Sequence, residues 1–277
     1  MRVLITGASG FIGRYLKAGL KRKYSIKTPS RTELDLLNAD ITRDYLATNP
    51  FDVVVHLATP TGHNPLDRQG EIFERSLRVF MSLLHCSDLF GKMIYIGSGA
   101  EYGKHRAIMS IQEDEFGDQL PQDSYGLSRY IMSETAGQHD NIYNLRIFGC
   151  YGMGDPPHKL IPFIISCIRE GKPIELKQNV VFDFLYVKDI VPIVEYFLEN
   201  TPKHKAYNLT SGIPILIGDI AAEVRRQMKS DVPIIFKRGG LGLEYTGNNV
   251  RLRSEIPNWQ PTKIEDGIRE ILLNENC

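Results

Sequence analysis

"ITGASGFIGRYL", residues 5–16, joins an apolar run to an amphipathic stretch and places three glycines between them. Gly7 permits a tight turn, Gly10 leaves the backbone open to a close approach, and Gly13 lets a helix pack closely on the preceding strand. The amino terminus of that helix, with its partial positive charge, would then face the phosphates of a ligand. The stretch therefore predicts a dinucleotide-binding turn at the start of a parallel sheet.

Short β-branched runs alternate with amphipathic stretches along the N-terminal half. Strands are expected at 2–6, 24–28, 52–58, 92–98 and 141–148, and helices at 11–22, 40–49, 71–90 and 124–139. Such alternation is typical of a parallel sheet with helices on both faces. After residue 150 the pattern loosens. Helices are expected there at 159–170, 189–199, 218–229 and 264–273, and strands at 181–187, 206–210 and 232–236.

We therefore expect a doubly wound α/β fold in two parts. Residues 1–150 would form the dinucleotide-binding domain. Residues 151–277 would form mainly a smaller C-terminal α/β substrate lobe, with some segments returning to the sheet.

Composition excludes several classes of function. Lys plus Arg and Asp plus Glu each number 33, so the net charge is zero, and no basic stripe indicates a nucleic-acid partner. The longest apolar run, at 160–168, is too short to span a bilayer, and residues 1–6 lack a signal peptide's pattern. Four cysteines without a CxxC pair and seven histidines without ligand spacing argue against disulfides and a metal site. We expect a cytoplasmic protein without membrane, nucleic-acid or metal partners.

The glycine stretch resembles the signature of the extended short-chain dehydrogenase/reductases, in the NAD-dependent epimerase/dehydratase group that acts mostly on nucleotide sugars. Further stretches resemble that family's motifs in order: "VVVHLAT" (53–59), "IYIGSGAEYG" (94–103), "SYGLSRY" (124–130), "LRIFGCYGMGD" (145–155) and "FDFLYVKDIV" (182–191). The resemblance implies a Rossmann sheet, a nicotinamide cofactor, a nucleotide-sugar substrate and a homodimer. The implied cofactor contacts in the glycine turn and after the third strand are Gly7, Ser9, Gly10, Phe11, Ile12, Gly13, Leu57, Ala58 and Thr59.

The same resemblance gives Ser98 and Tyr125 the catalytic positions and puts Arg129 where the family has lysine. Tyr125 and Arg129 are one helical turn apart and share a face, so both can contact one cofactor or substrate. Free tyrosine titrates near ~10, and a nearby cation favours the tyrosinate. Arginine keeps that charge, but its guanidinium is planar and wider than an ammonium. Three interpretations stay open: a functional site that tolerates arginine, a slow or specialised enzyme, and a helix whose tyrosine only packs.

Ser30 and Arg31 follow the second strand, where the cofactor's ribose is recognised. An arginine there would accept the 2′-phosphate of NADP, whereas an acidic residue would bind the 2′-hydroxyl of NAD. A spacing of about 20 residues after the glycines nominates Glu33 for the second role. We favour NADP (NADPH) and leave NAD open. The resemblance adds Asp35 and Leu36 as neighbours of the adenine.

At the substrate end, Phe182 replaces an arginine that helps the family hold the nucleotide diphosphate. Lys159 and Arg251 are candidates for that task, with Arg253 a further one. The resemblance places at the sugar pocket Ser98, Gly99, Glu101 and the loop 59–66, which carries His63.

The favoured function is NADPH-dependent reduction of a 4-keto-6-deoxy nucleotide sugar, a precursor of surface polysaccharide. The NADP-like turn and the modest length fit the reductase branch of the family. One alternative is an NAD-dependent nucleotide-sugar 4-epimerase, which would use the same serine and tyrosine. Another is a catalytically impaired dinucleotide-binding protein, which Arg129 and Phe182 keep open. A 4,6-dehydratase is disfavoured because "IGSGAEYG" has no Asp-Glu pair.

Overall fold

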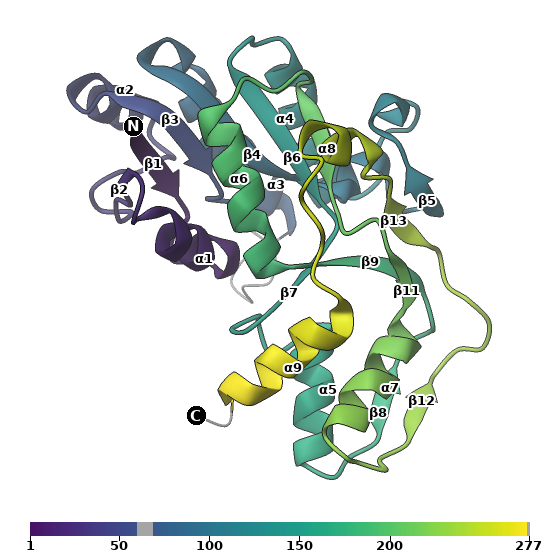
Figure 1. The fold of residues 1–277 in the computed structure, drawn as a ribbon. Helices are drawn as coiled ribbons and strands as arrows, with labels where there is room; N and C mark the ends of the chain where they lie inside the picture. Colours follow the sequence, from purple (N-terminus) through teal and green to yellow (C-terminus); the bar gives the residue numbers. More distant parts are fainter. Residues whose placement is uncertain (60–68, 276–277) are drawn as a thin grey trace.

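The computed structural model describes residues 1–59 and 69–275. Its main feature is a parallel six-stranded sheet, built from described residues in the order β10-β6-β4-β3-β1-β2 (Figure 1). The strands are β1 (Arg2–Thr6), β2 (Ser25–Lys27), β3 (Phe51–His56), β4 (Phe90–Ser98), β6 (Ile142–Ile147) and β10 (Ala206–Leu209). The expectation of a doubly wound Rossmann-type α/β fold is confirmed.

Helices cover both faces of this sheet because its strands are apolar on both sides. Successive residues of a strand point to opposite faces, so Val3 and Ile5 enter one core and Leu4 enters the other. Two helices pack over the first face, α1 (Phe11–Leu20) and α6 (Ile190–Glu199). Over the second face lie α2 (Ala39–Thr48), α3 (Gln69–Leu84) and α4 (Ser124–Gly137).

A second part of the molecule is built on short strands. Its main sheet has the order β11-β9-β13-β5 with β7 paired to β9, and β12 pairs with β8 separately. These strands are β5 (Ile108–Ile111), β7 (Gly149–Tyr151), β8 (Ile174–Leu176), β9 (Val181–Tyr186), β11 (Pro214–Leu216), β12 (Ile234–Phe236) and β13 (Tyr245–Gly247). The remaining helices are α5 (Leu160–Arg169), α7 (Ile217–Gln227), α8 (Val250–Glu255) and α9 (Ile264–Glu275). Helices α5, α7 and α9 share one apolar core and gather below the large sheet in Figure 1.

Short 3₁₀ turns connect several of these elements. They are η1 (Ser87–Leu89), η2 (Gly99–Tyr102), η3 (Glu113–Glu115) and η4 (Val187–Asp189). Of these, η2 follows directly on β4 and thereby carries the segment after Ser98 away from the large sheet.

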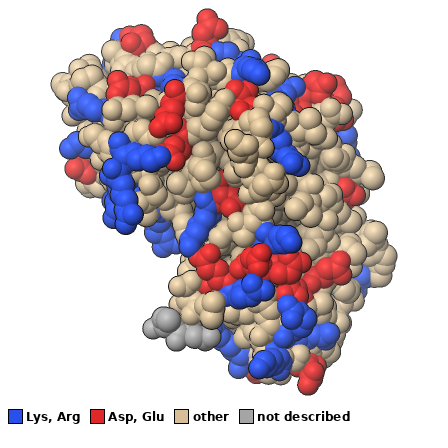
Figure 2. All heavy atoms as spheres, viewed as in Figure 1, with Lys and Arg blue, Asp and Glu red and all other residues tan. Residues whose placement is uncertain are grey.

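Segments from each side of the expected boundary at residue 150 contribute to the part of the molecule assigned to the other side. Strand β5, from the first half, joins the smaller sheet, while α6 and β10, from the second half, complete the large sheet and its cover. The division into domains 1–150 and 151–277 therefore stays a proposal. In the described part of the chain, no helix combines the length and apolarity needed to cross a bilayer. Basic and acidic side chains are interspersed on the face drawn in Figure 2.

Parallel pairing determines where a site can form. The carboxyl ends of β1, β3, β4 and β6 meet at one edge of the large sheet. The glycine turn, residues 57–59 and η2 all leave the sheet at this edge, which is where open α/β sheets bind ligands.

Candidate functional site

The glycine turn is shaped by close backbone contacts. Gly7 has φ +72°, and a Cβ there would lie 2.6 Å from the backbone nitrogen of Ala58. A Cβ at Gly13 would come 2.3 Å from the carbonyl oxygen of Gly7. At Gly10, the N-cap of α1, a Cβ would approach only that same oxygen, at 3.2 Å, and no described side chain caps the helix. The uncapped amides of the first turn of α1 fit the anionic phosphates of a dinucleotide.

Other predicted cofactor residues surround this turn. Ser9 is exposed, and Phe11 and Ile12 are half-buried in the first turn of α1. Leu57 packs against the core below α1, whereas Ala58 packs against the opposite core. The close contact between the backbones of residues 7 and 58 brings these two segments together.

The segment after β2 carries one acidic and one basic residue at the predicted ribose site, Glu33 and Arg31. The backbone nitrogen of Ser30 donates to Glu33 Oε2 over 2.7 Å, and this hydrogen bond lowers the pKa of the Glu33 carboxyl. The hydroxyls of Ser30 and Thr32 lie 2.9 Å apart. Arg31 is exposed and forms no hydrogen bond or ion pair with any described residue. The cation is therefore available to a ligand, whereas the carboxylate already has a backbone partner.

Asp35 and Leu36 follow as the structure continues toward α2. Asp35 is exposed, and its Oδ1 accepts a hydrogen bond of 3.0 Å from the backbone nitrogen of Leu37. Leu36 is buried in the core under α2 and α3. Neither placement tests their expected proximity to adenine.

Helix α4 brings Tyr125 and Arg129 to the sheet edge. The helix begins where Asp123 Oδ1 accepts the backbone N–H of Gly126 at 2.8 Å. Arg129 is only 2% exposed, and its Nη2 donates to Thr59 Oγ1 over 2.5 Å. Its guanidinium carbon lies 5.1 Å from the centre of the Tyr125 ring. Arg129 therefore joins α4 to the segment that follows β3.

The pKa of the Tyr125 hydroxyl is lowered from its usual value. Burial alone raises it, and Glu101 adds to that effect. The positive charge of Arg129, an interaction with the Ser98 side chain and the charge of Lys104 outweigh both. Lowering the pKa of a tyrosine toward neutral pH makes it a better proton donor and acceptor.

Ser98 is held by a buried polar network. Its backbone nitrogen donates to Glu101 Oε1 over 2.9 Å, and its hydroxyl accepts from the backbone of Ala100. Glu101 is 0% exposed, and its other oxygen forms an ion pair of 2.6 Å with Arg146. Asn144 donates to the same carboxylate over 3.0 Å. These contacts occupy the Glu101 carboxylate and indicate a role in holding Ser98, so the expected direct contact with substrate lacks structural support.

Lys159 and Arg251, the two other candidates for substrate binding, each lie near an acidic residue. Lys159 is the N-cap residue of α5. Burial raises the pKa of the Asp155 carboxyl to about 7, although the positive charge of Lys159 lowers it. Arg251 lies 3.6 Å from Glu113 and donates to the backbone oxygen of Ala206 over 3.4 Å. Glu113 in turn accepts a hydrogen bond of 2.7 Å from the backbone nitrogen of Asn208, near the carboxyl end of β10. A role of Arg251 in substrate binding stays a prediction.

Two residues not singled out in the sequence also reach this edge. For Tyr245, on β13, burial is the larger effect and raises the pKa of its hydroxyl, although Ser98 lies close enough for the serine side chain to lower that pKa. The Lys104 ammonium lies 5.7 Å from the centre of the Tyr125 ring. A Cβ at Gly99 would lie 2.6 Å from the Tyr245 hydroxyl oxygen, so a glycine is needed there. Within the loop 59–66, only Thr59 is described, and His63 lies outside the described residues.

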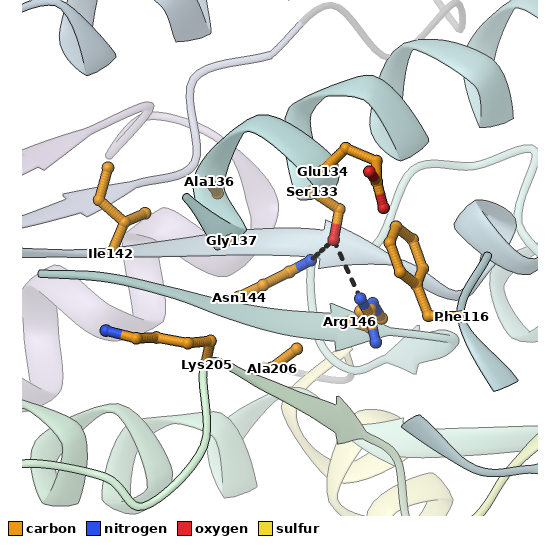
Figure 3. Close-up of a pocket in the computed structure, with 10 residues that line it drawn as sticks. All are labelled: Phe116, Ser133, Glu134, Ala136, Gly137, Ile142, Asn144, Arg146, Lys205 and Ala206. Carbon is orange, nitrogen blue, oxygen red and sulfur yellow. Dashed lines mark hydrogen bonds between the residues drawn. The ribbon is translucent and has the colours of Figure 1, made fainter. Parts of the chain in front are cut away.

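A pocket of about 230 Å³ lies elsewhere, beside α4 and the amino ends of β6 and β10 (Figure 3). Figure 3 shows Asn144 and Arg146 both directed at Ser133, to which they donate over 2.9 and 3.0 Å. The other nitrogens of Arg146 donate to Glu101 and Tyr102. Because this guanidinium already has its partners, we assign no chemistry to the pocket.

A model of the NAD dependent epimerase/dehydratase family matches residues 3–210. The chain belongs to this family. A dTDP-4-dehydro-6-deoxy-D-allose reductase from a Streptomyces species is 26% identical over 267 residues, covering 80% of this chain and 79% of that protein. The match to the family confirms that the chain is an enzyme of the NAD(P)-dependent epimerase/dehydratase type.

Solved structures of low sequence identity share the fold. The UDP-glucose 4-epimerase of Thermotoga maritima, with UDP-glucose, superposes with a TM-score of 0.86 at 18% identity, covering 100% of this chain and 99% of that one. The GDP-mannoheptose C4 reductase of Campylobacter jejuni, with NADP bound, gives 0.84 at 18% identity, covering 100% and 98%. Epimerases and reductases thus share this architecture.

Proposed function

We propose that the protein reduces a 4-keto-6-deoxy nucleotide sugar with NADPH. The observation that carries this proposal is the meeting of Ser98, Tyr125 and Arg129 at the sheet edge that also holds the glycine turn. The lowered pKa of Tyr125 supports its role as proton donor at neutral pH.

Each residue then has one task. The amides at the start of α1 bind the cofactor's phosphates, and Arg31 binds the 2′-phosphate. A bound nicotinamide dinucleotide supplies the hydride. Tyr125 gives its proton to the oxygen of the C4 carbonyl as the carbon–oxygen double bond becomes a single bond, and Ser98 donates a hydrogen bond to the same oxygen. The charge of Arg129 stabilises the tyrosinate that remains, until solvent returns the proton.

The choice of NADP rests on the segment after β2. Arg31 is without a partner among the described residues, whereas the Glu33 carboxylate accepts a hydrogen bond from the backbone of Ser30. The reductase from Campylobacter jejuni was solved with NADP bound, which agrees with this preference. The choice of a keto-deoxy sugar follows the dTDP-4-dehydro-6-deoxy-D-allose reductase, which is 26% identical. A homodimer and a cytoplasmic location remain predictions.

The test is direct turnover. Purified protein is mixed with NADPH and 4-keto-6-deoxyhexoses linked to CDP, dTDP, GDP or UDP, and NADPH absorbance is followed. We expect consumption of NADPH with at least one of the four, and a loss of about a hundredfold or more in Tyr125→Phe. Tyr130→Phe is the matched control, because Tyr130 lies on the same helix without a proposed catalytic role. Equal rates in wild type and Tyr125→Phe would reject Tyr125 as the proton donor.

A nucleotide-sugar 4-epimerase is the second candidate, favoured by the likeness to the Thermotoga maritima enzyme at a TM-score of 0.86. Ser98 and Tyr125 can serve that reaction as well, since it oxidises and re-reduces C4. An epimerase would interconvert two UDP-hexoses without net consumption of NADPH. Product analysis with UDP-glucose distinguishes the two reactions.

A further inference from the structure

Lys104 places a second positive charge beside the catalytic tyrosine. It follows η2 and Gly103, whose φ of +81° redirects the chain at this point. Its Nζ lies 5.2 Å from the centre of the Tyr245 ring and 5.7 Å from the centre of the Tyr125 ring. Both distances are within the range of a cation–π contact. Lys104 is exposed, and no described residue forms a hydrogen bond or ion pair with its ammonium.

The ring of Tyr245 is a fixed support for this ammonium. Tyr245 is 6% exposed, and the rings of Phe148 and Phe182 lie 5.0 and 4.9 Å from it, centre to centre. At the other end, its hydroxyl oxygen fills the space in which Gly99 has no side chain. This packing fixes the ring on which the ammonium lies.

The two cations near Tyr125 differ in chemistry. Arg129 is buried, hydrogen-bonded to Thr59 and permanently charged. Lys104 is exposed, and its charge is a compact ammonium on a flexible stem. The two side chains come from different elements, α4 and the segment between η2 and β5, so they are positioned independently.

We propose that Lys104 is a positioning residue for Tyr125, held on the ring of Tyr245, and that its ammonium stabilises the tyrosinate from the exposed side of the site. The proposal rests on the proposed function of Tyr125 as proton donor. It explains how a site with arginine in place of lysine can still contain a lysine ammonium next to its tyrosine.

The sign of the effect follows from the groups that face the Tyr125 hydroxyl. In the described structure these are Arg129 from α4, Ser98 from β4, Glu101 from η2, Lys104 after it, and Tyr245 from β13. Burial and Glu101 raise the pKa of Tyr125, while Arg129, Ser98 and Lys104 lower it. Removing the charge of Lys104 therefore raises the pKa, and replacing it with another cation does not.

The test follows tyrosine protonation without any substrate. Protein labelled with ¹³C at tyrosine Cζ is titrated by NMR between neutral and alkaline pH, and the Tyr125 signal is assigned by its loss in Tyr125→Phe. We expect Lys104→Met to move the Tyr125 titration to higher pH and Lys104→Arg to leave it near the wild-type position. Lys177→Met removes an exposed lysine of the smaller lobe and is the matched control, expected to change nothing. An unchanged Tyr125 titration in Lys104→Met would overturn the proposal.

Two further comparisons separate this role from a merely structural one. Lys104→Met in a Tyr245→Phe background should give the same shift, since the ring that supports the ammonium is kept. In turnover, Lys104→Met should lose about two- to fivefold near neutral pH, the worth of one exposed cation–π contact. That loss should disappear at alkaline pH, and a loss of the same size at every pH would contradict the proposal. If the protein reduces no keto sugar but still shows the titration shift, then this inference stands and the proposed function is wrong.

Discussion

Arg129 on α4 donates a 2.5 Å hydrogen bond to the hydroxyl of Thr59, three residues beyond the end of β3. This contact uses the reach of the guanidinium, because it joins the helix that carries Tyr125 to the strand end that borders the glycine turn. Lysine has a single side-chain nitrogen and therefore lacks the second nitrogen that an arginine can direct to another residue. The arginine therefore has a structural partner of its own in this site.

Thr59 is expected to stabilise the fold through this contact. In Thr59→Val, the buried Nη2 of Arg129 loses its acceptor at nearly constant side-chain volume. The free energy of unfolding should fall by about 1–3 kcal/mol, measured by urea denaturation. Thr59→Ser keeps the hydroxyl and should stay close to wild type. Equal stability of the valine and serine variants would show that the hydrogen bond contributes nothing.

Arg31 is expected to decide which cofactor binds. Arg31→Ala removes the cation proposed for the 2′-phosphate, so the affinity for NADPH should fall about tenfold or more, while that for NADH changes little. Nucleotide fluorescence measures both dissociation constants. Arg22→Ala, an exposed arginine beyond α1, serves as the control for general loss of positive charge. Parallel losses for the two nucleotides would place the 2′-phosphate elsewhere.

His56 should make the protein sensitive to acid. Its Nδ1 lies 2.7 Å from the Thr6 hydroxyl, and burial, helped by the charge of Arg129, lowers its pKa to about 3. An unfolded histidine titrates near ~6.5, so below that pH the unfolded chain binds a proton that the folded chain does not. Stability should therefore fall by about 1.4 kcal/mol per pH unit as the pH drops from 6.5 toward 3.

His56→Asn isolates this effect, because asparagine can keep a hydrogen bond to Thr6 without titrating. Between pH 7 and pH 5 the variant should lose about 2 kcal/mol less unfolding free energy than the wild type. The comparison of the two proteins cancels the contributions of other groups. Identical pH slopes would mean that His56 is not kept neutral by burial.

The central strands of the large sheet were predictable because they have five to nine residues and are apolar on both faces. β1, β3, β4 and β6 were found within a few residues of the expected positions. Five short strands of the second part of the molecule were missed. They are β5, β7, β8, β11 and β13, and each has only three or four residues. A periodicity of two is weak evidence over so short a run, although the equally short β2, β10 and β12 lie within strands expected at 24–28, 206–210 and 232–236.

The site was predictable where its residues are close in sequence. Tyr125 and Arg129 are one helical turn apart, and the structure places them together. Tyr245 reaches Ser98 only because β13 inserts between β9 and β5, a long-range pairing that no local pattern indicates. Glu101 was expected at the substrate, but its ion pair with Arg146 joins residues from two different strand ends and was likewise invisible in the sequence.

The most direct measurement of the central claim is a titration of the wild-type protein and of Arg129→Lys with NADPH and NADH, followed by nucleotide fluorescence. We predict that the wild type binds NADPH more tightly than NADH and that lysine at position 129 is not required for binding. If the wild type binds neither nucleotide and Arg129→Lys restores binding, then arginine has disabled the cofactor site and the proposed reductase is wrong.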